Sequence, residues 1–355
     1  MLDADTTRDA LVEQLLKSAT GALELFHVYI GDRLSLYEAL AQRGSMTSQG
    51  LAEATQISER YAREWLEQQA VSGFLNVESR DGDRLYSLPA AHSEVLVDRD
   101  SVAYLAALGR GIVSIGAVMP QILDAFRTGR GVPYELYGSD MRTSISALNR
   151  PAFDNLLGTA WFPKVPELHE RLQSEALVAD VGCGTGWSSI AIARAYPKVR
   201  VEGIDLDQAS IADARANARA AGVSDRVHFE VRDASEPKLA GQFDLVTAFE
   251  TIHDMAYPVE ALRAMRSLAR TGAYVVVMDE KADEEFNAPG DDLQRFLYGW
   301  SAVHCLAVGM TEPDSAGTGT VMRPATLRAY ARQAGFSDIE ILPIEHDSWR
   351  FYRLV

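Results

Sequence analysis

The stretch Val178 to Ser189 reads Val-Ala-Asp-Val-Gly-Cys-Gly-Thr-Gly-Trp-Ser-Ser, a short apolar run followed by three alternating glycines. Gly182, Gly184 and Gly186 carry no Cβ, so the backbone can turn sharply there and a ligand can lie directly against the main chain. A helix is expected from Ser188 to Ala195, with its first N–H groups directed at the same ligand. The stretch therefore predicts a strand, a binding loop and a helix, the unit from which parallel α/β sheets are built.

Two common phosphate-binding patterns do not fit this loop. A dinucleotide fingerprint counted from Gly182 would need glycine where Trp187 stands, and the Gly-Lys-Ser/Thr ending of a phosphate loop is absent. No Lys or Arg occurs from Leu177 to Ala193, whereas Asp180 lies inside the motif. This charge suits a nucleoside with a cationic group better than a pyrophosphate, and S-adenosylmethionine, with its sulfonium and amino group, is such a ligand.

Two further aspartates follow the next expected strands. Val199 to Asp205 reads as the second strand, and Asp205 falls about twenty residues past the glycines, the usual position of a ribose-binding acid. Val227 to Val231 reads as a third strand, and Asp233 just beyond it is placed to accept a hydrogen bond from an adenine amino group. Either aspartate alone is more often a helix cap or a turn residue, but their occurrence at successive strand ends favours a binding site.

With these residues the chain resembles the class I S-adenosylmethionine-dependent methyltransferases. Over nearly its full length it is similar to the bacterial small-molecule methyltransferases that join a winged-helix-like N-terminal domain to a class I methyltransferase domain. The motifs that carry this likeness, besides 180–186, Asp205 and Asp233, are Gly31-Asp32-Arg33-Leu34 with Tyr37, Tyr61 to Trp65, Gly131-Val132-Pro133-Tyr134 with Tyr137-Gly138, and Ile252-His253-Asp254. The resemblance implies S-adenosyl-L-methionine as the cofactor. The cofactor site that it implies consists of Asp180, Gly182, Cys183, Gly184, Gly186, Asp205, Leu206, Asp233, Ala234, Phe249 and Glu250.

From residue 173 to residue 355 the pattern alternates strand and helix, with strands expected near 177–181, 199–205, 227–231, 243–249 and 273–279. Such alternation is typical of an α/β protein with a doubly wound, Rossmann-like parallel sheet. Two final strands, 339–344 and 349–355, are how the sheet ends in the family that the chain resembles. Residues 281–322 interrupt the pattern with a bulky apolar insertion, which we expect to be either a lid over the site or a pair of surface helices.

Residues 1–100 predict a winged-helix-like domain. An apolar helical segment is expected from Leu11 to Leu40 and a tight pair of helices from Met46 to Gly73, followed by a hairpin around Asp81-Gly82. The region holds about nine basic and about seventeen acidic side chains, the reverse of a DNA-binding footprint. We therefore expect the apolar helices to hold a homodimer. Residues 101–172 read as a helical bridge to the second domain.

Bulk composition limits the class of protein. The 355 residues are 47% hydrophobic and 24% charged, as in soluble globular proteins long enough for two cores. The net charge of −16 opposes a nucleic-acid partner. Two cysteines cannot form a disulfide framework, which favours a reducing, cytoplasmic setting. The start of the chain does not look like a signal peptide, and charges break every apolar stretch, so no membrane segment is expected.

His253 is the expected general base. It follows the strand expected at 243–249, at the edge of the sheet where ligands bind, and a histidine titrates near pH 6.5. His253-Asp254 resembles the His-Asp of plant and bacterial O-methyltransferases, whose histidine is the base, and Asp279 at the next strand end is the candidate to fix its tautomer. Helix capping or a backbone hydrogen bond by His253 is an equally open alternative. Glu250 and His253 lack further ligands at suitable spacing, so no metal is expected.

Five residues are candidates to line a substrate cavity between the two domains. They are Tyr134, Tyr137 and Trp161, just before the second domain, and Trp300 and His304 in the insertion. Packing in the core is the alternative for such aromatic residues. The expected function is methyl transfer to an oxygen, nitrogen or carbon atom of a small aromatic or apolar acceptor. The alternatives are a winged-helix regulator with a ligand-sensing, inactive methyltransferase domain, and a non-methylating S-adenosylmethionine enzyme.

Overall fold

The computed structural model describes residues 4–233 and 240–355 and divides the chain into two compact units. The first unit runs to Gly116 and includes Thr143–Pro151, and the second comprises Ala117–Arg142 and Ala152–Val355. The segment 101–172, expected as a bridge, is thus shared between the two units. No helix in the described part of the chain is both long enough and apolar enough to cross a membrane.

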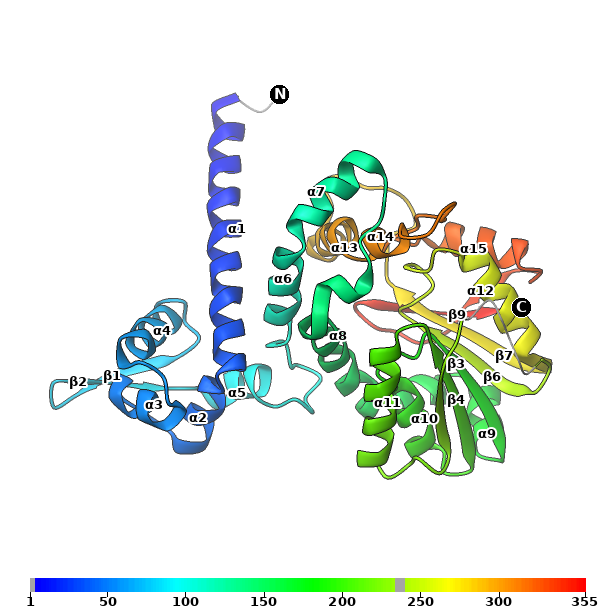
Figure 1. Cartoon of the computed structure of the whole chain (residues 1–355), viewed down its shortest axis with the longest axis horizontal. Helices are drawn as coiled ribbons and strands as arrows, with labels where there is room; N and C mark the ends of the chain where they lie inside the picture. The colour runs from blue at the N-terminus through cyan, green and yellow to red at the C-terminus, as the bar shows by residue number, and fades with distance from the viewer. Residues whose placement is uncertain (1–3, 234–239) are drawn as a thin grey trace. The chain divides into compact units, whose positions relative to one another are not determined.

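The N-terminal unit consists of helices and one small hairpin (Figure 1). Its elements are α1 (Ala4–Arg33), α2 (Leu36–Arg43), α3 (Ser48–Thr55), α4 (Glu59–Val71), β1 (Asn76–Arg80), β2 (Asp83–Ser87), α5 (Ala90–Leu96) and α6 (Leu108–Ala117). The predicted hairpin is confirmed: β1 and β2 pair antiparallel, and Asp81 and Gly82 between them both have positive φ angles, as a tight two-residue turn requires. The predicted apolar segment 11–40 is broken at Ser35, whose φ of 55° ends α1 before α2 begins.

The second unit is built on a seven-stranded sheet. Its strands are β3 (Ala176–Val181), β4 (Val199–Asp205), β5 (Val227–Val231), β6 (Phe243–Phe249), β7 (Ala269–Glu280), β8 (Ile339–Ile341) and β9 (Trp349–Leu354). They lie in the order β5-β4-β3-β6-β7-β9-β8, with β3 to β7 parallel and β9 antiparallel to both neighbours. The predicted doubly wound sheet is therefore confirmed. The chain leaves β3 first in one direction and then in the other, so the carboxyl ends of β3 and β6 flank the switch point where ligands bind in such sheets.

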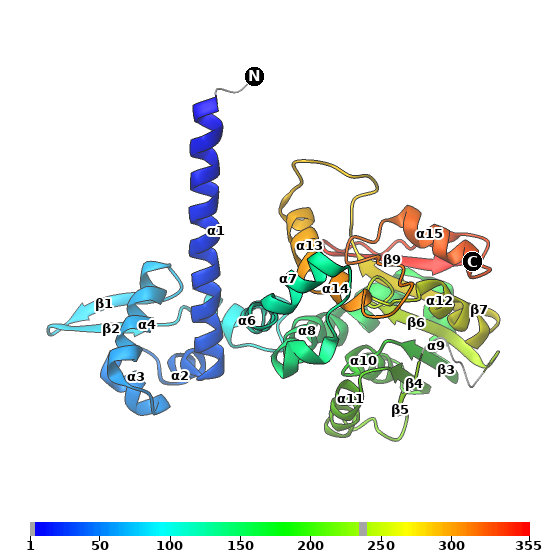
Figure 2. The ribbon, with the colours of Figure 1, turned by 45° about the horizontal axis from the view of Figure 1, so that its top comes forward.

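Two layers of helices cover this sheet (Figure 2). The π-helical segment η2 (Phe153–Trp161), α9 (Pro166–Leu172), α10 (Trp187–Ala195) and α11 (Gln208–Ala220) pack on one face, and α12 (Pro258–Leu268) and α15 (Pro324–Gln333) pack on the other. Burial on both faces explains why the strands are continuous apolar runs. The remaining elements are α7 (Met119–Thr128), η1 (Tyr134–Tyr137), α8 (Gly138–Ala152), η3 (Phe162–Lys164), α13 (Asp292–Val303) and α14 (Cys305–Gly309).

Candidate functional site

The glycine loop follows β3 directly, as predicted. Gly182, Gly184 and Gly186 have φ angles of 67°, 53° and 83°, which side-chain-bearing residues rarely adopt. A Cβ at Gly182 would lie 2.2 Å from the side chain of Thr251, and one at Gly186 would lie 2.5 Å from the ring of Phe229. A Cβ at Gly184 would meet nothing within 4 Å. Packing thus requires the first and third glycines, whereas the second leaves its backbone open to a ligand.

Asp205 ties the loop to the end of β4. Its two carboxylate oxygens accept the backbone N–H groups of Gly184 and Asp207, each at 2.8 Å. Burial raises the pKa of Asp205, and these two hydrogen bonds oppose that shift. The backbone of Leu206 also donates to this carboxylate, which offers about four acceptor sites, so acceptor capacity remains and contact with the ribose hydroxyls stays a prediction. Leu206, the next residue, is exposed.

The side chain of Asp180 is buried under the glycine loop. Its side chain is 1% exposed and accepts the hydroxyls of Ser188 at 2.5 Å, Ser189 at 2.6 Å and Thr247 at 2.8 Å. These bonds fasten the first turn of α10 and the strand β6 to β3, which fixes both ends of the glycine loop between β3 and α10. Direct contact of Asp180 with a ligand stays a prediction. Cys183 is buried, which raises the pKa of its thiol and fits a packing residue.

Asp233 is exposed and follows β5 by two residues. The backbone N–H of Arg232 donates to the carbonyl of Asp205 at 2.9 Å, which draws the ends of β4 and β5 together. The predicted contact of Asp233 with an adenine amino group stays a prediction, and Ala234 lies outside the described residues.

His253 and Asp279 are brought together at the ends of β6 and β7. Nδ1 of His253 lies 2.7 Å from Oδ1 of Asp279, and the two side chains are 4% and 1% exposed. Burial lowers the pKa of His253, but the Asp279 carboxylate and neighbouring groups raise it well above its usual value. Asp279 therefore occupies one ring nitrogen of His253, so the geometry favours the predicted pairing over a helix cap.

A second pair of acids occupies the same strand ends. Glu250, in a left-handed conformation with φ of 52°, accepts a hydrogen bond from the indole N–H of Trp349. A side-chain hydrogen bond joins Glu250 to Glu280. Burial raises the pKa of both carboxyls, and the charge of Glu250 raises that of Glu280 further. Phe249, just before this pair, stacks on Phe153 at a ring distance of 5.8 Å.

Four of the five predicted substrate residues form one aromatic cluster. The ring of His304 lies 5.9 Å from that of Tyr134, 4.8 Å from that of Tyr137 and 5.6 Å from that of Trp300. The hydroxyl of Tyr137 donates to the carbonyl of Val303 at 2.8 Å, which joins η1 to the end of α13. All of these residues belong to the second unit, and their contact with a substrate stays a prediction.

Trp161 lies apart from that cluster. It is 2% exposed and packs against His346, Trp349 and Phe351, with ring distances of 5.7 Å, 5.7 Å and 5.0 Å. This is the core packing left open as the alternative for the aromatic residues. Trp161 packs against Trp349, and the indole N–H of Trp349 donates to Glu250.

Cys305 connects the aromatic cluster to His253. Its Sγ atom lies 3.3 Å from Nδ1 of His304, and a side-chain hydrogen bond links it to His253. Burial raises the pKa of the Cys305 thiol, but the two imidazoles lower it to about 5. Among the residues that the structure describes, no group of three or more His, Cys, Asp or Glu side chains is arranged to hold a metal ion.

Comparison with known proteins bears on both units. Residues 172–314 match a family model described as a methyltransferase domain. This segment is a methyltransferase domain. Residues 21–98 match the Rv2258c-like winged HTH domain, so the predicted winged helix is also confirmed.

Solved structures share the fold of the methyltransferase domain and of the region before it. A putative O-methyltransferase from Nostoc punctiforme has a TM-score of 0.72 at 20% identity, and the match covers 99% of this chain and 100% of that one. Human N-acetylserotonin methyltransferase, solved with SAM, has a TM-score of 0.73 at 17% identity and 97% coverage of both chains. At these identities the likeness establishes the fold.

Curated relatives match parts of the chain. Ajmaline N-methyltransferase from Rauvolfia serpentina is 31% identical over 126 residues, which are 35% of this chain and 41% of that protein. The chain spans less than two thirds of the length of each of the first relatives that it matches.

Glu280, Trp349 and Cys305 were not predicted as site residues. Glu280 had one signal in the sequence, its position beside Asp279 at a strand end, and Cys305 had its position beside His304. Trp349 had none, because it reaches the methyltransferase domain from a strand that follows it by many residues.

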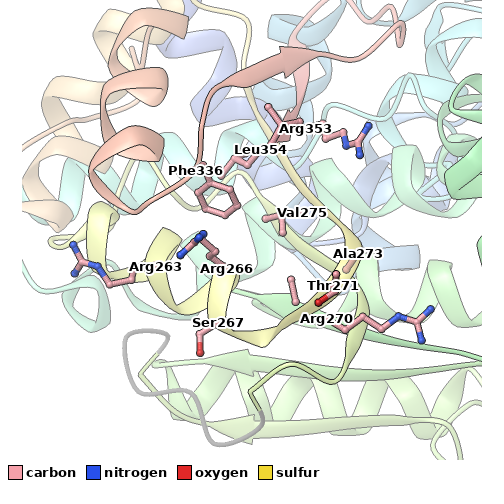
Figure 3. Close-up of a pocket in the computed structure, with 12 residues that line it drawn as sticks. Arg263, Arg266, Ser267, Arg270, Thr271, Ala273, Val275, Phe336, Arg353 and Leu354 are labelled. Atoms are coloured by element: carbon pink, nitrogen blue, oxygen red, sulfur yellow. The ribbon is translucent and has the colours of Figure 1, made fainter.

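A hollow of about 650 Å³ lies away from these residues, around the first part of β7 (Figure 3). Its lining includes Arg263, Arg266, Arg270 and Arg353. Figure 3 shows the side chain of Arg263 directed to the left and those of Arg270 and Arg353 directed to the right. Arg270 pairs with Asp244 instead, so the hollow lacks converging charges and we do not assign it to the site.

Proposed function

We propose that the protein transfers a methyl group from S-adenosylmethionine to a small-molecule acceptor. The observation that carries the proposal is the meeting of two sets of residues at one edge of the sheet. The glycine loop and Asp205 lie at the carboxyl ends of β3 and β4, and the His253–Asp279 pair lies at those of β6 and β7. The family match of residues 172–314 supports the same activity.

The loop and its neighbours fit the cofactor on four grounds. The space beside Gly184 is open to the methionine end, and the Asp205 carboxylate retains acceptor capacity for the ribose hydroxyls. Asp233 is accessible for the adenine amino group. No Lys or Arg from Leu177 to Ala193 opposes the cationic sulfonium. When bound, the cofactor supplies a methyl group on a good leaving group, so the protein has to orient the acceptor and handle one proton.

Cofactor binding is the first test. Because a hydrogen bond to a charged group contributes about 1.5 to 3 kcal/mol, Asp205→Ala should weaken S-adenosylmethionine binding about tenfold or more. Asp213→Ala, an exposed aspartate on α11, is the matched control and should bind normally. Calorimetry measures both. Unchanged affinity in the Asp205 variant, or tight binding of NADH by the unaltered protein, would contradict the assignment.

His253 is the group that takes the proton from a hydroxyl acceptor, with Asp279 holding its other nitrogen. General-base removal costs about a hundredfold to ten-thousandfold in rate, so His253→Ala should lose at least the lower factor while retaining cofactor affinity. His228→Ala, an exposed histidine on β5, should turn over normally. Labelled cofactor incubated with phenols, amines and carboxylates identifies the acceptor, and near-normal turnover of the His253 variant would mean that no base is needed.

A DNA-binding regulator is the competing function, and the charges of α4 oppose it. Arg60 pairs with Glu64 and Arg63 pairs with Glu59 on the same helix, which neutralises the helix that would enter a DNA groove. We expect no shift of DNA fragments on a gel. A specific shift would favour the regulator.

We also propose a cytoplasmic homodimer held by α1. Its Leu11, Val12, Leu15, Leu16 and Leu23 are between 51% and 64% exposed. An apolar stripe of this kind on a soluble domain is typical of an interface, and a second copy of the same helix matches it. Leu15→Glu with Leu16→Glu should give a monomer by light scattering. A monomer without these changes would contradict the proposal.

A further inference from the structure

Four polar side chains form a continuous row across the site. Asp279 contacts His253 at 2.7 Å, His253 is hydrogen-bonded to Cys305, and Cys305 contacts His304 at 3.3 Å. The row runs from the end of β7, through the residues after β6, to the junction of α13 and α14. All four side chains are at most 5% exposed, so water does not screen the charges within the row.

Both ends of the row are open. Oδ2 of Asp279 and Nε2 of His304 are buried, and neither has a hydrogen-bond partner in the described part of the chain. An unpaired buried polar atom is costly, so each one calls for an explanation such as a catalytic role or a bound water or ion. His304 is 2% exposed inside the cluster of Tyr134, Tyr137 and Trp300, so its unpaired nitrogen is enclosed by aromatic rings.

The charges around the row are mostly negative. Glu250 and Asp254 face it from the residues after β6, and Asp279 and Glu280 face it from the end of β7. His253, whose pKa is raised, is the group of opposite sign. Burial raises the pKa of Asp254 to about 7 and raises that of Glu280, so these two carboxyls bind protons more readily than exposed ones. Cys305 differs, because an imidazole lies on each side of its sulfur atom.

We infer that Cys305 is a positioning residue for His253: it stands as a thiolate between the two imidazoles and keeps His253 protonated. The role concerns the base of the methyl transfer proposed above and rests on that function. His253 is then an imidazolium between two anions, the carboxylate of Asp279 and the thiolate of Cys305. It becomes a base by releasing one proton to water, which leaves a neutral ring beside both anions.

The charge state of Cys305 is tested on the protein without cofactor or acceptor. Thiolate absorbance at 240 nm is followed from pH 4 to pH 9, with circular dichroism as the check on folding. Cys183→Ser is the matched control, because it leaves Cys305 as the single thiol. We expect a midpoint near 5 in this variant and no thiolate signal from folded Cys305→Ser. No thiolate below pH 8 in folded Cys183→Ser would overturn the inference.

The effect on His253 is measured by NMR titration of the imidazole, assigned with His253→Asn. An opposite charge within hydrogen-bond distance shifts a pKa by about one to three units, so Cys305→Ser should lower the midpoint of His253 by at least about one unit. An unchanged midpoint would overturn the inference. Should Cys305→Ser fail to fold, His253→Asn in the Cys183→Ser background takes its place: a higher thiol midpoint supports the pairing and an equal one refutes it. Neither the thiol titration nor the imidazole titration measures methyl transfer, so both remain informative if the proposed function is wrong.

Discussion

Replacing Asp279 by Asn tests the pairing with His253 through the pH dependence of stability. The substitution keeps the shape and an acceptor oxygen but removes the charge. The contact is 2.7 Å long, and with charge centres about 4 Å apart and an effective dielectric constant of about 20 the attraction is about 4 kcal/mol. This equals about three pKa units, so the pKa of His253 should fall by up to that amount.

The sign of the pH dependence follows from the raised pKa of His253. A raised histidine pKa contributes stability that is fully present below the unfolded value near pH 6.5 and is lost as pH rises through the folded value. Asp279→Asn should therefore lower the free energy of unfolding by about 3 to 4 kcal/mol at pH 6 and by clearly less near pH 10.

Urea unfolding at both pH values gives the two free energies. Asp244→Asn is the control, because Asp244 is also buried but pairs with Arg171 and Arg270, and arginine side chains are always charged in proteins. The loss of unfolding free energy in Asp244→Asn should be the same at both pH values. An equal loss at both pH values in Asp279→Asn would refute the charged pairing, as would the same pH trend in Asp244→Asn.

Three further outcomes follow from the site. Gly186→Ala should cost about 1 to 3 kcal/mol in unfolding free energy, and more than Gly222→Ala, because both have positive φ but only the first Cβ meets an aromatic ring; equal costs would contradict this. Thr247→Val should cost about 1.5 to 3 kcal/mol by thermal unfolding, since it removes one of three hydroxyls from a buried carboxylate. Trp349→Phe should raise the pKa of Glu250, because the indole bond lowers it, and carboxyl-carbon NMR checks the direction.

The sheet could be predicted from sequence because burial on both faces makes its strands plain apolar runs. Val199 to Asp205, Val227 to Val231 and Phe243 to Phe249 were predicted with the bounds that the structure has. The first residue of β7 was harder to predict. β7 begins at Ala269 and not at 273, through Arg270, Thr271 and Gly272, which lack an apolar pattern.

The site was predictable where strand order alone decides proximity. His253 follows β6 and Asp279 lies at the end of β7. These two strands are adjacent and parallel, so their carboxyl ends lie side by side. Cys305 and Trp349 reach the site from an irregular insertion and from an antiparallel strand, whose paths no local pattern fixes. Trp161 was grouped with the other aromatic residues because it lies near them in sequence, but a π-helical segment turns it into the core.

The two hydrogen bonds of Asp205 also have a kinetic consequence. Because the N–H groups of Gly184 and Asp207 donate to this carboxylate, contacts within the protein itself hold the loop in place. A ligand that enters a preformed cradle does not lose affinity to loop immobilisation. Its capture should therefore be a single bimolecular step, with an observed rate that rises linearly with ligand concentration and reaches no plateau.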